Sequence, residues 1–393
     1  MVTYPRDWKE VQIGDIYQIK RGQVLATNKI SPIKNNTSKY PVYSSQTLNN
    51  GLLGYYHQFL FANGITWTTD GANAGTTKYR EGQFYCTNVC GVLSSQEGYA
   101  NACMAEIINK ETPKHVSYVG NPKLMSNVVS KISIILPPLS EQQAIASTLS
   151  DFDEHIDNLS ELIEKKKAIR DGALEDLVSG RTRLDGFNGE WVEMTLEDIC
   201  VPNGLVRGPF GGSLKKEMFV SKGNKVYEQR NAIYKSVRIG DYYISNGKYN
   251  ELSRFAVKAD DFIVSCSGTI GKIFKIPKQY KRGIINQALL KISIDQTKCN
   301  LNYFYKYFEW DKFQDSIIDN TQGGAMKNLV GMDIFRKTVI LMPRDITEQK
   351  AIAQIISAMD EEIESLKIEK EKMIQIKEGA MDDLLTGRVR LKV

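Results

Sequence analysis

The sequence is poor in metal-ligating residues and has no long hydrophobic run. Its three histidines, at positions 57, 115 and 155, are far apart, and the six cysteines form no C-x-x-C pair. Structural zinc needs four such ligands at close spacing, so we expect no metal site. The stretch KISIILPPL is far shorter than the roughly 20 residues that span a bilayer, and MVTYPRDWKE lacks the apolar core of a signal peptide. These absences predict a chain of the reducing cytoplasm, without a membrane span.

Signatures of catalysis are also missing. SGTIGK is followed by isoleucine, so it lacks both the spacing of a phosphate loop and the hydroxyl that holds magnesium. LPPL at 136–139 is not the N-P-P-Y type of motif associated with amino-methylation of bases, and no G-x-G-x-x-G follows a strand. We therefore expect no catalytic residue and no cofactor of the chain's own. A nuclease or methyltransferase hidden in one part of the chain is the enzymatic alternative.

What the sequence does have is an internal duplication. At a shift of 207 residues, positions 140–184 align without gaps to 347–391, and 21 of the 45 pairs are identical. A weaker similarity aligns WKEVQIGDI (8–16) with WVEMTLEDI (191–199), and each of these segments begins a long stretch that is not similar to the other. Because 393 residues exceed the roughly 250 to 300 that one core supports, we predict four segments. They are block 1 (1–139), a central helix (140–184), block 2 (185–344) and a C-terminal helix (345–393).

The duplicated segments have the periodicity of coiled-coil helices. Apolar residues alternate at spacings of four and three, which predicts two helices of about 40 residues, or roughly 60 Å each. Ser140 and Thr347 are candidate N-caps, and Gly180 and Gly387 stand where helices usually stop. Cations take core-type positions further along, at Lys166, Arg170, Lys370 and Lys377. The predicted seam consists of Ile145, Leu149, Phe152, Ile156, Leu159, Ile352, Ile356, Met359, Ile363 and Leu366.

Two arrangements would bury these stripes. Two helices of equal length can pack on each other as an antiparallel pair, and the duplicated seam favours this rod. The alternative is that each helix docks on its own block. Both blocks contain short β-type runs between turns, so the predicted fold is α+β, with two mixed recognition domains, two long antiparallel helices and an internal pseudo-twofold repeat.

Charge divides along the same boundaries. The formal net charge is +5 for residues 1–139, −4 for 140–184, +7 for 185–344 and −4 for 345–391. Basic blocks between acidic helices indicate that the blocks approach a polyanion. A solvated surface, or a scaffold whose basic blocks bind protein, would carry the same charge.

Polar, glycine-rich turns recur in both blocks. Block 2 has GPFGGSLKKEM (208–218), SCSGTIGK (265–272) and INQ (285–287), and block 1 has SSQT (44–47), TTDGANAGTT (68–77) and CTN (86–88) as equivalents. Their amides, hydroxyls and cations can bond base edges or phosphates, and glycine allows close backbone approach. NYFYKYFEW (302–310) could stack on bases but reads more simply as a core-packing helix. The predicted DNA-binding residues are Gln46, Thr69, Asn73, Lys215, Lys216, Gln229, Arg230, Asn231 and Lys272.

Taken together, these features resemble the DNA-specificity subunit of Type I restriction-modification enzymes, a bacterial defence system. The resemblance rests on the helical segments PLSEQQAIASTLSDFDEHID and DITEQKAIAQIISAMDEEIE, their endings DLVSGRTRL and DLLTGRVRL, and the two blocks between them. It implies a non-catalytic subunit whose blocks each read one half of a split double-stranded DNA target. The helices would then set the spacing and dock modification subunits, two of them, with restriction subunits assembling around the rod. S-adenosylmethionine, ATP and magnesium would belong to those partners.

Overall fold

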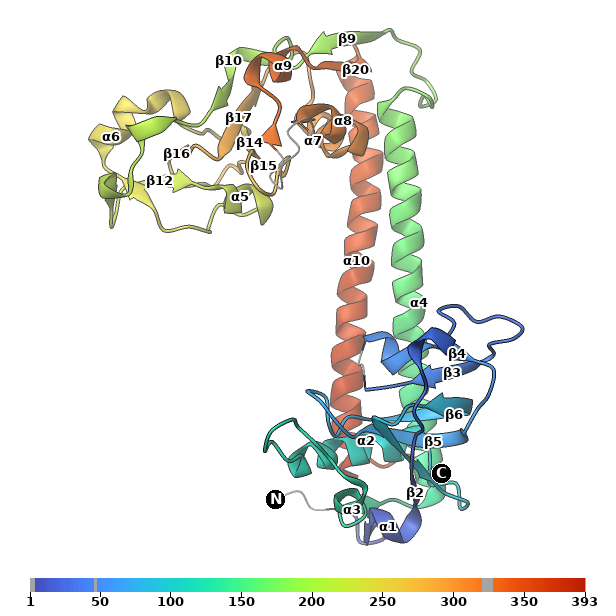
Figure 1. Cartoon of the computed structure of the whole chain (residues 1–393). Coiled ribbons are helices and arrows are strands. Elements are labelled where there is room, and N and C mark those ends of the chain that lie inside the picture. The colour runs from blue at the N-terminus through green and yellow to red at the C-terminus, as the bar shows by residue number, and fades with distance from the viewer. Residues whose placement is uncertain (1–3, 46–47, 320–327, 393) are drawn as a thin grey trace. The chain divides into compact units, whose positions relative to one another are not determined.

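The computed structural model describes residues 4–45, 48–319 and 328–392. The chain divides into two compact units, Met1–Glu161 with Lys367–Val393, and Leu162–Leu366. The division falls inside both long helices, α4 (Leu139–Val178) and α10 (Ile346–Leu385), each 40 residues long as predicted (Figure 1). Each unit therefore holds one block and parts of both helices. No helix within the described ranges is long and apolar enough to cross a membrane.

The first unit is built around a six-stranded sheet of order β2-β7-β5-β6-β3-β4, in which only the β3–β6 pair is parallel. Helix α2 covers one face, where Ile65, Trp67 and Leu93 share a buried cluster with Met104 and Ile108 (Figure 1). Strands β1 and β8 form a separate ribbon that leads into α4. The elements are β1 (Lys9–Gln12), α1 (Ile13–Ile16), β2 (Gln18–Arg21), β3 (Tyr40–Tyr43), β4 (Leu52–Tyr56), β5 (Phe61–Thr68), β6 (Thr77–Cys86), β7 (Cys90–Ser94), α2 (Ala102–Glu111), α3 (Ser126–Val129) and β8 (Ser133–Leu136).

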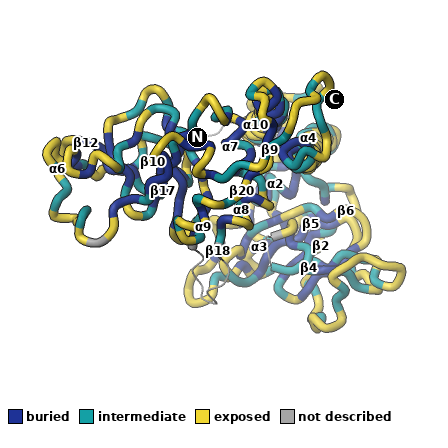
Figure 2. Tube along the Cα trace, turned by 90° about the horizontal axis from the view of Figure 1, so that it is seen from above, coloured by how far each residue is buried: buried dark blue, intermediate teal, exposed yellow. Residues whose placement is uncertain are grey.

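The second unit contains two four-stranded sheets, β10-β17-β14-β15 and β11-β13-β12-β16, with β12 and β16 parallel. Strand β17 is drawn mainly in the dark blue of buried residues in Figure 2. The ribbon of β9 and β20 leads into α10, as β1 and β8 lead into α4. The elements are β9 (Trp191–Thr195), β10 (Cys200–Arg207), β11 (Phe219–Val220), β12 (Asn224–Tyr227), α5 (Gln229–Ile233), β13 (Tyr243–Ile244), α6 (Asn246–Glu251), β14 (Phe262–Ser265), β15 (Ile273–Lys275), β16 (Gly283–Ile285), β17 (Leu289–Ile294), α7 (Leu301–Glu309), α8 (Asp311–Ile317), β18 (Ile318–Asp319), β19 (Asn328–Leu329), α9 (Met332–Lys337) and β20 (Val339–Pro343).

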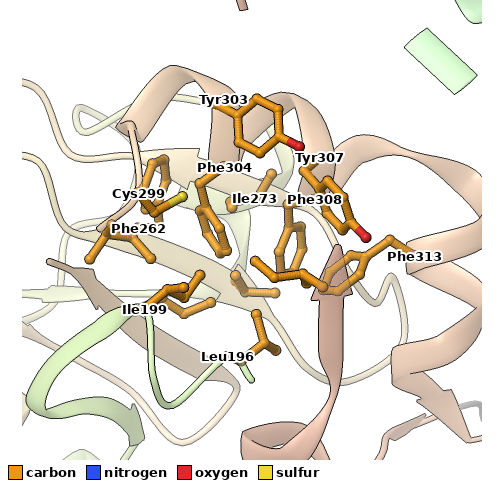
Figure 3. Packing of buried hydrophobic residues seen from close by; sticks show 14 of the residues in the cluster. Leu196, Ile199, Phe262, Ile273, Cys299, Tyr303, Phe304, Tyr307, Phe308 and Phe313 are labelled. Carbon is orange, nitrogen blue, oxygen red and sulfur yellow. The ribbon is translucent and has the colours of Figure 1, made fainter. Parts of the chain in front are cut away.

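The aromatic run NYFYKYFEW forms α7 in the core of the second unit. Tyr303, Phe304, Tyr307 and Phe308 recur at helical spacing and are buried against Phe313 and the β10-β17-β14-β15 sheet (Figure 3). Asn300 caps the helix by accepting hydrogen bonds from the amides of the second and third helical residues. The core-helix interpretation is therefore confirmed, and these rings are not free to stack on bases.

The ends of the long helices differ in part from the sequence prediction. Gly180 and Gly387 follow the last helical residues with φ of 71° and 69°, a left-handed conformation that glycine adopts without steric cost. The N-cap predictions are wrong: Ser140 and Thr347 lie inside the first turns, because α4 already begins at Leu139 and α10 at Ile346. At α10 the amide and hydroxyl of Thr347 both donate to the Asp345 carboxylate, at 2.7 Å.

Within each unit the two helices run antiparallel and are joined by ion pairs. In the second unit Arg170 and Lys166 of α4 pair with Asp360 and Glu362 of α10, at 2.8 and 2.7 Å. In the first unit Lys377 pairs with Asp153 at 2.5 Å. Asp153 and Asp360 are equivalent in the repeat, as are Arg170 and Lys377. Lys166, Arg170 and Lys377 therefore lie opposite acids of the neighbouring helix, and the equivalent ion pair is present in each unit.

The predicted seam residues differ in where they pack and in how far they are buried. Ile145 and Leu149 join the core of block 1 together with Leu384 and Leu385 of α10, while Ile352 and Ile356 join the core of block 2. The first turns of both helices are thus docked on their blocks, which was the alternative arrangement. Further along, Leu159 and Ile363 are buried, and Phe152, Ile156, Met359 and Leu366 are half-buried.

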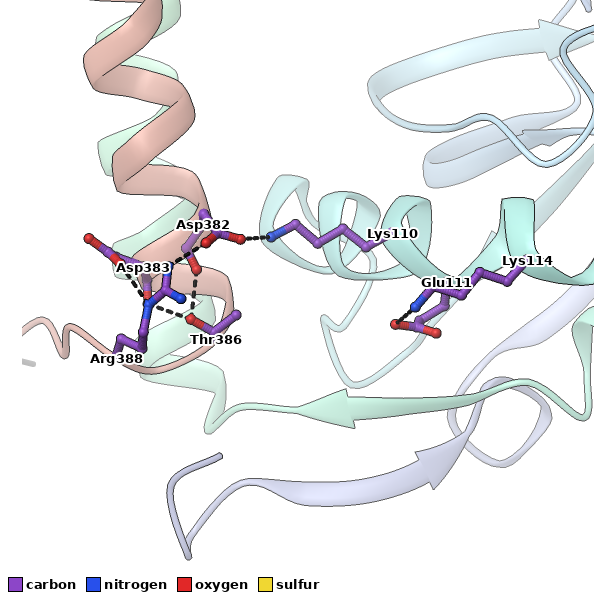
Figure 4. Close-up of polar contacts among 7 residues, drawn as sticks. All are labelled: Lys110, Glu111, Lys114, Asp382, Asp383, Thr386 and Arg388. Carbon is purple, nitrogen blue, oxygen red and sulfur yellow. Dashed lines mark hydrogen bonds and ion pairs between the residues drawn. The ribbon is translucent and has the colours of Figure 1, made fainter. Parts of the chain in front are cut away.

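Polar contacts also fix the end of α10 to block 1. Lys110 of α2 pairs with Asp382 at 3.0 Å, and Arg388 donates to both Asp382 and Asp383 (Figure 4). The hydroxyl of Thr386 donates back to the Asp382 carbonyl at 2.7 Å. The last turn of the chain's final helix is therefore part of the first unit.

Candidate nucleic-acid interface

In the second unit the polar turns found in the sequence meet at the ends of three strands. The Gly208 amide, after β10, donates to the Leu289 carbonyl, and the Asn286 amide donates to the Tyr227 carbonyl at the end of β12, both at 2.9 Å. The Cys266 amide, after β14, donates to the Ala288 carbonyl at 2.9 Å. The turn at 286–288 thereby brings GPFGGS, SGTIGK and the start of α5 together.

The first unit has the same arrangement, although the two blocks share little sequence. The backbone amide of Gly22, after β2, donates to the Cys90 carbonyl, and the Thr87 amide donates to the Tyr43 carbonyl at the end of β3. The Thr69 amide, after β5, donates to the Val89 carbonyl, and all three distances are 3.0 Å. The turns that follow also agree, since Gly75 donates to Thr68 and Gly271 donates to Ser265, both at 2.9 Å. We call this shared set of backbone hydrogen bonds the strand-end frame. The equivalence expected between the polar turns of the two blocks is thus seen in their backbones.

All four predicted cations of block 2 lie exposed around this frame. Lys215, Lys216, Arg230 and Lys272 are exposed, and Arg230 pairs only loosely with Glu228, at 3.4 Å. Gln229 is half-buried, with its amide nitrogen beside Gly268 of the SGTIGK turn. Exposed lysines at the rim and an amide further in can meet phosphates and base edges respectively.

Asn231 is a correction. Its side chain is fully buried and donates to the carbonyls of Ser236 and Ile239 at 2.7 and 2.8 Å. Its oxygen accepts from the Glu228 amide at 2.8 Å. Every polar group of this side chain is therefore used to fold the loop after α5, and none is available to DNA.

Block 1 gives a mixed result for its three predicted residues. Asn73 is exposed in the turn between β5 and β6. Thr69 is a second correction, because it is 1% exposed and its hydroxyl donates to Asp70 at 2.6 Å while accepting from Arg21 at 3.3 Å. Gln46 lies outside the described residues.

Two arginines at this site were missed from the sequence. Arg21 is the last residue of β2 and Arg207 the last residue of β10, so they occupy the same place in the two frames. The glycine that follows each arginine has no room for a side chain. A Cβ atom at Gly22 would lie 2.2 Å from the Thr87 carbonyl oxygen, and a Cβ atom at Gly208 would lie 1.8 Å from the Asn286 carbonyl oxygen. An Arg-Gly pair near the start of both blocks is the sequence signal that could have found them.

The buried thiol beside Arg207 is neutral at physiological pH. Burial raises the pKa of Cys266 to about 11, and the contact with Arg207 only partly opposes this. Within the described ranges, no three His, Cys, Asp or Glu side chains are grouped so as to hold a metal ion. The exposed side chains described around the two frames supply hydrogen-bonding groups and positive charge.

Comparisons with known proteins agree with this arrangement. The family model of the type I restriction modification DNA specificity domain matches twice, over residues 5–167 and 188–377. A Mycoplasma pneumoniae chain named as a type I specificity subunit is 31% identical over 352 residues, which cover 88% of each chain. The specificity subunit of the type I restriction enzyme MjaVIII, from Methanocaldococcus jannaschii, is 24% identical and covers 99% of this chain and 94% of its own.

Solved structures show the same fold. The S subunit of a type I restriction-modification system from M. genitalium superposes with a TM-score of 0.60 at 17% identity, covering 98% of this chain and 97% of that one. A subunit from Thermoanaerobacter tengcongensis gives 0.52 at 12% identity, with 98% of both chains covered. With two family domains that together take in most of its length, the chain belongs to the family of type I restriction-modification DNA-specificity subunits.

Proposed function

We propose that each block recognises one half of a two-part double-stranded DNA sequence. The observation that carries this proposal is the strand-end frame, which is built twice from equivalent backbone hydrogen bonds but presents different side chains. A common backbone with variable side chains is what two readers of different sequences require, because base edges are distinguished by the donors and acceptors that face them.

The cations around the frames and the predicted amides would contact different parts of the DNA. Lys215, Lys216, Arg230 and Lys272 are exposed, which suits phosphate contacts that hold the duplex without reading it. Gln229 in block 2, with Asn73 and Gln46 in block 1, would contact base edges. Loss of a phosphate contact should weaken all sequences alike and lower the salt slope by about one unit.

The helices α4 and α10 would set the distance between the half-sites and dock the modification subunits. Ile169 and Ile376 are equivalent in the repeat and are 60% and 54% exposed. A duplicated exposed isoleucine supports two equivalent docking sites. Restriction subunits would join the same complex, and S-adenosylmethionine, ATP and magnesium would be bound by those partners. The purified chain alone should then neither methylate nor cut DNA when given methyl donor and magnesium.

A block exchange tests the proposal. Residues 17–136 are replaced by the corresponding block of a relative, and the complex with its modification subunit is used to select from random duplexes. One half of the selected sequence should change and the other half should stay. As a control, replacing only residues 140–184 by those of the relative should leave both half-site sequences unchanged. If the block exchange alters both halves, or if the unaltered complex selects no sequence, the proposal is wrong.

A further inference from the structure

Arg207, at the end of β10, lacks a charged partner among the residues described in its unit. It forms no ion pair with any residue that the structure describes, and its Nε is buried without a hydrogen-bond partner among them. A buried donor left unsatisfied is costly, so its persistence calls for an explanation. The side chain lies against the Cys266 thiol, which is neutral and supplies no negative charge. Among the described residues this half-buried guanidinium therefore has no carboxylate partner.

The equivalent arginine of block 1 has an acidic partner. Arg21 pairs with Asp70 at 3.0 Å, donates to the Asn88 carbonyl at 2.8 Å and reaches the Thr69 hydroxyl at 3.3 Å. Asp70 follows Thr69 in one frame as Ser267 follows Cys266 in the other. The carboxylate that pairs with the arginine in block 1 is thus replaced in block 2 by the exposed hydroxyl of Ser267.

The setting of Arg207 suits a base edge better than a phosphate. Exposed lysines already stand around the frame at 215, 216 and 272, and a flexible ammonium is sufficient for a phosphate. Reading a base requires a donor fork in a fixed orientation, and partial burial at a strand end provides this. The two-pronged guanidinium matches the O6 and N7 acceptors of guanine in the major groove. Phe210, three residues further on, is 68% exposed and adds an apolar surface at the same turn.

We propose that Arg207 reads a guanine in the half-site of block 2, and that Asp70 withholds the equivalent Arg21 from this role in block 1. The inference rests on the proposed function, since it names a residue that carries specificity within one of the two recognition blocks.

Selection from random duplexes by the complex with the modification subunit tests the inference. The wild-type complex should select a guanine in the second half-site. Arg207→Gln should reduce the preference for it by roughly 10- to 100-fold, with the first half-site unchanged. Ser267→Asp should capture Arg207 as Asp70 captures Arg21 and remove the same preference, whereas the uncharged control Ser267→Asn should keep it. Asp70→Ser should release Arg21 and create a new guanine preference in the first half-site.

Each of the other possible results contradicts one specific claim of this proposal. If Arg207→Gln weakens all sequences equally, Arg207 contacts a phosphate and the base-reading role is wrong. If Ser267→Asp keeps the guanine that Arg207→Gln loses, the capture argument fails, and an unchanged first half-site in Asp70→Ser removes the claim about Asp70. A wild-type complex that selects a sequence without guanine in the second half-site refutes the role of Arg207 alone. One that selects nothing refutes the proposed function as well.

Discussion

The guanidinium of Arg183, just after α4, donates two hydrogen bonds of 2.8 and 2.9 Å to the carboxylate of Glu348, in the first turn of α10. That carboxylate is 1% exposed and also accepts from the Trp191 indole at 3.3 Å. In the first unit Arg390, Glu141 and Trp8 repeat the arrangement, with the Arg390 Nη2 at 2.8 Å and the indole nitrogen at 2.9 Å from Glu141. The end of one long helix and the start of the other are therefore tied together twice, once in each unit.

Removing this arginine should be costly because the acid would stay buried. We expect Arg183→Ala to destabilise the second unit at the low end of about 3 to 5 kcal/mol, since the arginine itself is partly exposed. Arg181, two residues earlier, makes only surface pairs with Glu175 and Asp176, so Arg181→Ala should cost about 0 to 1 kcal/mol. Denaturant unfolding of both variants measures the difference, and equal losses would contradict the assigned role.

Acid should weaken the pairing of the helices in the second unit. Burial disfavours ionisation of Asp360, but ion pairs with Lys306 and Arg170 outweigh it and hold the pKa of the carboxyl below its ordinary value of 3.8. Because the pKa is lower in the folded state, the stabilisation is complete above the unfolded value and is lost as pH falls through the folded one.

Asp360→Asn should therefore cost about 1.5 to 3 kcal/mol at pH 7, and the difference from wild type should shrink below about pH 4. Asp171→Asn is the control, because Asp171 is 69% exposed and contacts Arg170 from the surface. Urea unfolding at several pH values provides the measurement. A difference that grows on acidification would show that the pair does not lower the pKa.

The duplicated isoleucines should each control one modification subunit. Ile169→Asp and Ile376→Asp lie at exposed positions, so their effect on folding should be within about 0.5 kcal/mol. Each single variant should lower the number of bound modification subunits from two to one, and the double variant should bind none. Mass measurement of the reconstituted complex gives the stoichiometry. Leu162→Asp, whose repeat equivalent is Glu369, is the control and should keep both.

The spacing between half-sites should follow the length of α4. Four residues added within 160–170 make about one turn and lengthen the helix by about 6 Å. At about 3.4 Å per base pair the preferred gap should grow by one or two base pairs, with both half-site sequences unchanged. Two added residues rotate the following helix by about half a turn and break the seam, so binding should be lost. An unchanged gap in a folded four-residue variant would rule out the helices as the ruler.

Local signals in the sequence were enough for the two long helices and for α7. The apolar spacing of α4 and α10, the terminal Gly180 and Gly387 and the aromatic period of α7 are all local, and each predicted its element. The N-cap at Ser140 was wrong because α4 already begins at Leu139, and the one at Thr347 was wrong because the Asp345 carboxylate accepts the Thr347 amide.

By itself the sequence determined the duplication, the family and the two long helices, because unbroken similarity and helical period need no knowledge of distant contacts. Only the tertiary structure decided which polar residues face outward, since Thr69 and Asn231 look like their exposed neighbours until their buried partners are known. It also decided that the two blocks share one frame. That frame is made of backbone hydrogen bonds between distant strands, and such bonds constrain few side chains. Arg21 can therefore pair with Asp70, while Arg207 has no ion-pair partner in the described part of its unit.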